Sequence, residues 1–97
     1  MRFEYATRFQ KSLRRLPLHD QRRVAETIEQ IVVYCETRQA PQGLGLNKLF
    51  SREELGAVFE ARLSLDSRLL FTVQRDIVTF VMVGDHDDIR LFIKASH

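Results

Sequence analysis

The sequence has little of what stabilises small secreted or membrane proteins. Cys35 is the single cysteine, so no disulfide can form within the chain and packing must hold the fold. Tryptophan is absent, and two prolines with four glycines are too few for a low-complexity or Pro/Gly-rich chain. No apolar run approaches the roughly 20 residues of a membrane helix, and the charged start is unlike a signal peptide. We therefore expect a cytoplasmic protein with an ordinary core and no membrane association.

Size and charge are those of one small domain covering residues 1–97. The chain is 44% hydrophobic and 29% charged, with a formal net charge of +2 and a pI of about 9.0. This mild excess of positive charge is compatible with a nucleic-acid or an acidic protein partner and does not choose between them. The charges are unevenly placed, because arginines crowd the first third while Asp85, Asp87 and Asp88 lie together near the end.

The stretch from Gly56 to Gly84 predicts a β-meander. It contains three runs rich in Val, Phe, Leu and Ile, and each is bounded by Gly, Ser or Asp. In the first two runs apolar residues alternate with residues such as Glu60, Arg62 and Arg68, which predicts one apolar and one charged face. The third run, 77–83, is apolar on both sides, as expected of a central strand.

Helices are predicted on both sides of the meander. After a short strand at 2–6, apolar residues recur at helical spacing from Thr7 until Pro17, and again from 18 or 19 to 37. These two helices form a hairpin over the apolar face. Residues 48–55 are ambiguous, with Ser51 and Glu54 resembling the capping box of a single helical turn. A short C-terminal helix follows, capped by Asp85 or Asp87. The expected fold is α+β, a two-layer β-α-α-β-β-β arrangement with a mostly antiparallel sheet.

Glu60, Arg62 and Arg68 form the first candidate site. Arg68 begins the strand after that of Glu60 and Arg62, so all three can converge on the charged face. Two guanidinium groups match a phosphodiester, and the carboxylate between them can transfer protons. The same pattern also fits a solvated ladder of cross-strand ion pairs.

His86 and a basic helical surface are the other candidates. His86 follows the last strand, and histidine changes charge near neutral pH; its alternative is a surface residue beside a helix cap. The basic surface either faces solvent or binds nucleic acid. Its residues are Lys11, Arg14, Arg15, Arg22 and Arg23.

Four motifs along the chain resemble the RelE/ParE superfamily of bacterial toxin–antitoxin toxins. They are Lys48-Leu49, Gly56-x-Val58-Phe59-Glu60-x-Arg62-Leu63, Asp66-Ser67-Arg68-Leu69-Leu70-Phe71 and Val83-Gly84-Asp85-His86-Asp87. The resemblance implies a toxin that a cognate antitoxin neutralises in a hetero-oligomer. RelE-like members cleave mRNA on the ribosome without a metal or other cofactor, whereas ParE-like members inhibit DNA gyrase without catalysis. We expect the nuclease, with the gyrase inhibitor and an inactive repressor subunit as alternatives.

The resemblance also implies roles for individual residues. In RelE-like cleavage the ribose 2′-hydroxyl attacks the adjacent phosphate. Arg62 and Arg68 match basic positions that bind this phosphate, and His86 matches the acid that protonates the leaving oxygen. Glu60 falls where some members carry lysine and is a candidate base. Lys48 and Phe92 complete the expected RNA contacts, although some relatives carry a tyrosine where Phe92 lies.

Overall fold

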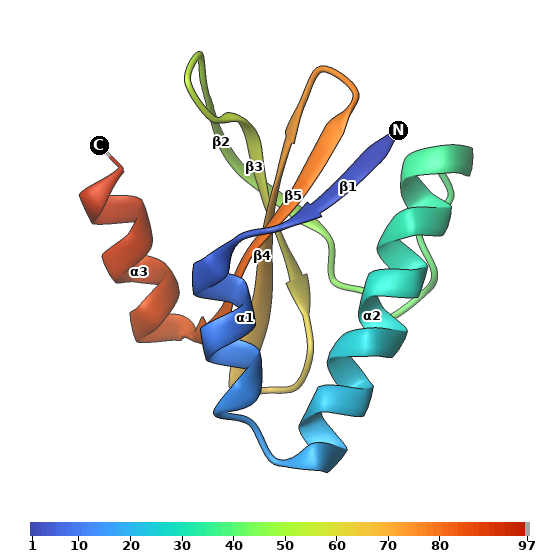
Figure 1. Ribbon diagram of the computed structural model, residues 1–97. Coiled ribbons are helices and arrows are strands. Elements are labelled where there is room, and N and C mark those ends of the chain that lie inside the picture. The colour runs from blue at the N-terminus through green and yellow to red at the C-terminus, as the bar shows by residue number, and fades with distance from the viewer. Residues whose placement is uncertain (97) are drawn as a thin grey trace.

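The computed structural model describes residues 1–96, which form five strands and three helices (Figure 1). The elements are β1 (Arg2–Tyr5), α1 (Thr7–Arg14), α2 (Leu18–Thr37), β2 (Asn47–Arg52), β3 (Gly56–Arg62), β4 (Ser67–Gln74), β5 (Ile77–Asp85) and α3 (His86–Ala95). The strands form one sheet in the order β1-β5-β4-β3-β2. β1 pairs with β5 in parallel, and the remaining pairs are antiparallel. The predicted α+β class and mostly antiparallel sheet are confirmed.

The helical hairpin of α1 and α2 covers one face of the sheet, as predicted. Phe9 of α1 and Val24 and Ile31 of α2 are buried against Phe71 and Phe80 of the central strands. Pro17 is the N-cap of α2, where its missing amide hydrogen costs nothing. The apolar side chains at the predicted helical spacing therefore pack into the main hydrophobic core.

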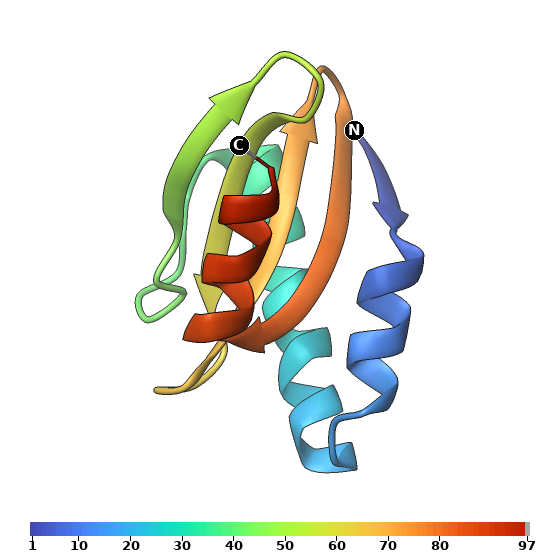
Figure 2. The same cartoon turned by 90° about the vertical axis from the view of Figure 1, so that its left-hand side faces the viewer.

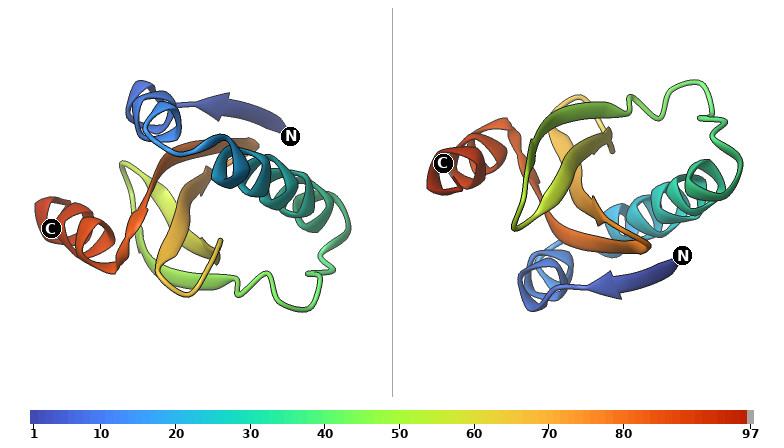
Figure 3. Two further views of the ribbon diagram at one scale, coloured as in Figure 1. Left: turned by 90° about the horizontal axis from the view of Figure 1, so that it is seen from below. Right: turned by 90° about the horizontal axis from the view of Figure 1, so that it is seen from above.

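The opposite face carries a second, smaller core rather than charged residues alone. Val58, Leu70 and Met82 are buried there beneath Ile89 of α3. Figure 2 shows α3 in front of the sheet, and Figure 3 shows it on the side opposite to α2. The expectation of one apolar and one charged face is therefore corrected. α3 adds a partial third layer on this face of the sheet.

Residues 47–52 form a fifth strand where the sequence suggested a helical turn. Ser51 lies in β2, opposite Ala57 of β3, and caps no helix. The strand alternation is hidden in the sequence because the register shifts between Lys48 and Phe50. Gly56 begins β3 with a φ of +82°, and a Cβ there would lie 2.3 Å from the carbonyl oxygen of Val73. Glycine is therefore required at this turn.

No helix within residues 1–96 is both long enough and apolar enough to cross a membrane.

Candidate functional site

A hollow lies where β4 and β5 meet the start of α3, and we call it the strand-end notch. It has a volume of about 290 Å³ and is lined by Leu65, Asp66, Arg68, Asp85, His86 and Asp87. Arg68 pairs with Gly84 across β4 and β5, and His86 is the first residue of α3. The antiparallel register therefore brings together two residues that are 18 positions apart in the sequence.

The turn between β3 and β4 holds the Arg68 side chain in place. Its Nη1 donates to the carbonyl oxygens of Ser64 at 2.8 Å and Ser67 at 3.1 Å. The Ser64 hydroxyl in turn accepts from the backbone N–H groups of Asp66 and Ser67. Within residues 1–96, every hydrogen bond from this guanidinium leaves from Nη1. Nε and Nη2 are therefore free to donate to an anion.

Asp85 and Asp88 fix the start of α3 through a reciprocal capping box. The Asp88 N–H donates to Oδ1 of Asp85 at 2.9 Å, and the Asp85 N–H donates to Oδ2 of Asp88 at 3.0 Å. The bond from the Asp88 backbone lowers the pKa of the Asp85 carboxyl below its ordinary value of 3.8. Gly84 makes the box possible, because a Cβ there would lie 2.6 Å from the Asp88 Cβ. His86 is thus presented from a rigid helix start, and the predicted Asp85 cap is confirmed.

The other predicted catalytic residues do not line the strand-end notch. Arg62 is opposite Arg68 in the strand pair, yet it lines a separate hollow of about 140 Å³ with Arg23 and Gln42. Glu60 lies two cross-strand pairs further from the strand end than Arg62, opposite Leu70. The four residues expected in one active site are therefore divided: Arg68 and His86 converge, whereas Arg62 and Glu60 lie apart from them.

The remaining predicted RNA contacts also lie away from the notch. Lys48 is exposed and pairs with Phe59, so it occupies the sheet face of the helical hairpin. Phe92 packs against the second core, and the Arg8 guanidinium lies 5.7 Å from its ring centroid. The face of Phe92 that could stack on a base is thus in contact with Arg8.

Sequence reasoning missed Asp66, which lies at the tip between the two strands. Its side chain is exposed and lines the notch beside Arg68 and His86. The sequence signal that could have identified Asp66 as a site residue was its position in a turn, two residues before Arg68. Asp66 is therefore the carboxylate that lies beside Arg68 and His86, where Glu60 was expected.

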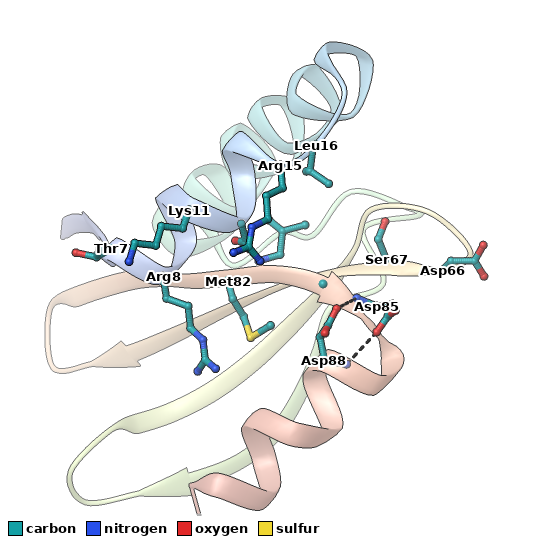
Figure 4. Close-up of a pocket in the computed structure, with 13 residues that line it drawn as sticks. Thr7, Arg8, Lys11, Arg15, Leu16, Asp66, Ser67, Met82, Asp85 and Asp88 are labelled. Atoms are coloured by element: carbon teal, nitrogen blue, oxygen red, sulfur yellow. Dashed lines mark hydrogen bonds between the residues drawn. The ribbon is translucent and has the colours of Figure 1, made fainter.

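A wider cleft of about 840 Å³ separates α1 from β5 and α3, and we call it the α1 cleft (Figure 4). Arg8 and Lys11 of α1 and Arg15, the C-cap of that helix, line one side, while Asp66, Asp85 and Asp88 line the opposite side. Figure 4 shows Arg8 and Arg15 reaching from α1 towards the sheet, with Met82 beneath. The cleft and the strand-end notch share Asp66 and Asp85, so the two hollows are adjacent.

Across the described chain, residues 1–96, no group of three or more His, Cys, Asp or Glu side chains is placed to hold a metal ion.

The order of strands, the hairpin on one face and a short helix after the last strand together define the structural class of this chain. Solved structures of that class are toxins of toxin–antitoxin systems, and they confirm the fold that the sequence resemblance implied. The RelE–RelB complex of Pyrococcus horikoshii matches with a TM-score of 0.67 and 21% identity, covering 87% of this chain and 92% of that one. The RelB–RelE complex of Methanococcus jannaschii matches with a TM-score of 0.65 and 19% identity, covering 92% and 96%.

The DinJ–YafQ complex of Escherichia coli matches with a TM-score of 0.64 and 18% identity, covering 92% of this chain and 98% of that one. No protein-family model matches the sequence, and no curated protein matches it. The chain thus has the RelE and YafQ fold over nearly its whole length, at a level of identity that establishes the fold alone.

Proposed function

We propose that this protein is the toxin of a toxin–antitoxin pair and acts as an endoribonuclease on ribosome-bound mRNA. The observation that carries the proposal is the convergence of Arg68 and His86 on the strand-end notch, beside Asp66. A phosphate-binding cation, a titratable imidazole and a carboxylate are the groups that metal-free RNA cleavage requires. The likeness to RelE and YafQ supports the toxin role.

The reaction proceeds by attack of the ribose 2′-oxygen on the adjacent phosphorus. Asp66 accepts the 2′ proton as the new oxygen–phosphorus bond forms. Protonated His86 donates its proton to the 5′ oxygen as the bond from phosphorus to that oxygen breaks. The products are a 2′,3′-cyclic phosphate and a 5′-hydroxyl, so protons and bonds balance without a further reactant.

Arg68 stabilises the charge that develops on the phosphate. Its position is set by the carbonyl oxygens that hold Nη1, leaving Nε and Nη2 for the phosphate oxygens. A donor fixed before the reaction costs no reorganisation in the transition state. Arg62, Lys48 and Glu60 lie outside the notch, and we assign the first two to RNA contacts beyond the cleaved phosphate.

The partner in the resting cell is a cognate antitoxin. The similar structures from P. horikoshii, M. jannaschii and E. coli are complexes of a toxin with RelB or DinJ. We propose that this chain forms a comparable hetero-oligomer in which the antitoxin covers the strand-end notch or the basic surface of the helices.

The deciding experiment is an in vitro translation reaction with purified protein and a defined mRNA, in which primer extension maps the new 5′ ends. We expect cuts on ribosome-bound message that disappear with Arg68→Ala. Arg75→Asn is the matched control, since it removes the same charge at the far end of β4, at a φ of +58° that asparagine tolerates. Intact message with the wild-type protein refutes the nuclease, and inhibition of gyrase supercoiling then identifies the alternative target.

A further inference from the structure

The α1 cleft carries three cations that no carboxylate of the described chain neutralises. Arg8, Lys11 and Arg15 line it, whereas the ion pairs within residues 1–96 are Arg2–Glu4 and Arg52–Glu54. The three cleft residues are spaced three and four positions apart, so they lie along one side of α1. At about 1.5 Å per residue they span roughly 10 Å of the helix axis. This row of cations suits an extended anion rather than a single one.

The opposite wall is acidic, and the carboxylates of Asp85 and Asp88, though not that of Asp66, are already engaged. Asp85 and Asp88 each accept the other's backbone N–H at the first turn of α3. Negative charge at a helix N-terminus is favoured by the helix dipole. The remaining lone pairs of these carboxylates can accept further hydrogen bonds. The exocyclic amino group of a nucleobase is a suitable donor. The cleft therefore pairs a phosphate-binding wall with a wall that can accept from bases.

The floor of the cleft is apolar. Met82, which is 6% exposed, and the half-buried Leu16 both line it. A thioether makes favourable contacts with aromatic rings, and unpaired RNA bases are bound by such stacking and apolar contacts. Arg8, stacked on Phe92, holds α1 against α3 at one end. Cations, acceptors and an apolar floor together fit a nucleotide better than a simple acidic peptide.

We propose that the α1 cleft binds the single-stranded RNA next to the cleaved phosphate. The phosphates follow Arg8, Lys11 and Arg15, and one unstacked base lies on Met82. Because Asp66 and Asp85 line both hollows, a strand leaving the strand-end notch enters the cleft directly. This inference rests on the proposed function, which supplies the RNA strand.

The test measures binding without cleavage. The probe is a short fluorescein-labelled RNA carrying 2′-O-methyl groups, which cannot undergo 2′-oxygen attack, and the readout is anisotropy at several salt concentrations. The test variant is Lys11→Gln with Arg15→Gln, which leaves the Arg8–Phe92 contact in place. The matched control is Arg14→Gln with Arg22→Gln, which removes two exposed charges that line neither hollow.

We expect the test variant to bind on the order of tenfold more weakly at low salt, and its salt slope to fall by about 1.4, or about 0.7 for each lost phosphate contact. The control should bind as the wild type does. Equal losses in both variants overturn the assignment, because they indicate general attraction. A second result would also overturn the assignment to RNA: the wild type binds a glutamate-rich peptide as tightly as the RNA, and the test variant weakens both. That result would indicate a protein ligand.

Failure of this inference is distinct from failure of the proposed function. If the wild type cleaves ribosome-bound mRNA and the test variant binds RNA as the wild type does, only the assignment of the α1 cleft as an RNA site is overturned. Absence of cleavage together with cleft-dependent RNA binding would overturn the nuclease and keep the cleft as an RNA site.

Discussion

Arg62 and Arg68 are directly paired across β3 and β4, yet their side chains line different hollows. Like charges opposite each other on one face of a sheet repel. Arg68 turns to the carbonyl oxygens of the 64–67 turn, while Arg62 runs beside Gly45, with its Nε 3.5 Å from where a Cβ would be. The pair therefore separates into one residue at the notch and one outside it.

Substitutions at the two arginines should have unequal effects on cleavage. Arg68→Ala removes a preorganised donor to the phosphate, and we expect the rate to fall roughly 100- to 1,000-fold. Arg62→Ala removes a solvent-exposed charge worth up to about 1 kcal/mol, so the rate should fall less than about fivefold. Single-turnover cleavage on programmed ribosomes measures both.

Arg68→Lys is the companion to this pair of variants. Lysine keeps the charge but cannot bond the turn and the phosphate at once, so its rate should lie between those of the wild type and Arg68→Ala. Equal losses for Arg62→Ala and Arg68→Ala would show that the two side chains converge during catalysis despite their separation in this structure.

Gly84→Ala should damage the site without removing any functional group. The new Cβ would lie 2.6 Å from the Asp88 Cβ and 2.8 Å from its Oδ2, so the capping box must shift and move His86 with it. We expect about 1–3 kcal/mol lower stability and a clear loss of cleavage. Urea unfolding and ribosome cleavage measure the two effects.

Asp88→Ala is the control for Gly84→Ala, since it loses the same hydrogen bond without crowding the backbone. A greater loss of cleavage in Gly84→Ala than in Asp88→Ala is expected from the backbone shift. Wild-type stability and cleavage in Gly84→Ala would contradict the idea that close packing here positions His86.

The sequence was sufficient for features set by local pattern. The helix spacing placed the second helix from residue 18 or 19 to 37, and the aspartates after Gly84 predicted the cap of α3. It was insufficient where one extra residue disturbs the pattern. β2 was missed because the register shift after Lys48 breaks the alternation that marks a strand.

The site was only partly predictable for a related reason. Alternation places the Cβ of Arg62 and Arg68 on one face, but their long side chains then follow the surrounding charges and carbonyl groups. The α1 cleft joins α1, the 66–67 turn and the end of β5, which are distant in sequence. Arg8 and Met82 could not be connected without the fold.

The capping box should make stability depend on pH in the acid range. The pKa of Asp85 is lowered in the folded state, chiefly by the hydrogen bond from the Asp88 backbone. The ionised carboxyl therefore stabilises the folded state, and this stabilisation is complete above the ordinary pKa of 3.8. As the pH falls through the lowered pKa, the folded carboxyl takes up a proton and the contribution is lost. Asp85→Ala should therefore be less stable than the wild type at neutral pH, with the difference shrinking in acid.

Asp85→Asn separates charge from hydrogen bonding at the cap. Asparagine is also a good N-cap, so this variant should keep much of the stability of the wild type and lose the acid dependence of that contribution. Urea unfolding between about pH 2 and pH 7 gives the comparison. A constant difference between Asp85→Ala and the wild type across that range would assign the effect to packing.

Ile89 should control whether α3 stays docked. It is 4% exposed, lies on Val58, Leu70 and Met82, and is the residue of α3 that is buried. Ile89→Ala should cost about 2–5 kcal/mol, and amide exchange should accelerate in α3 before it does in β4. Leu91→Ala is the matched control, because Leu91 is 65% exposed on the same helix. Since His86 begins α3, cleavage should fall in Ile89→Ala and persist in Leu91→Ala; an undisturbed α3 in Ile89→Ala would show that the capping box alone holds the helix.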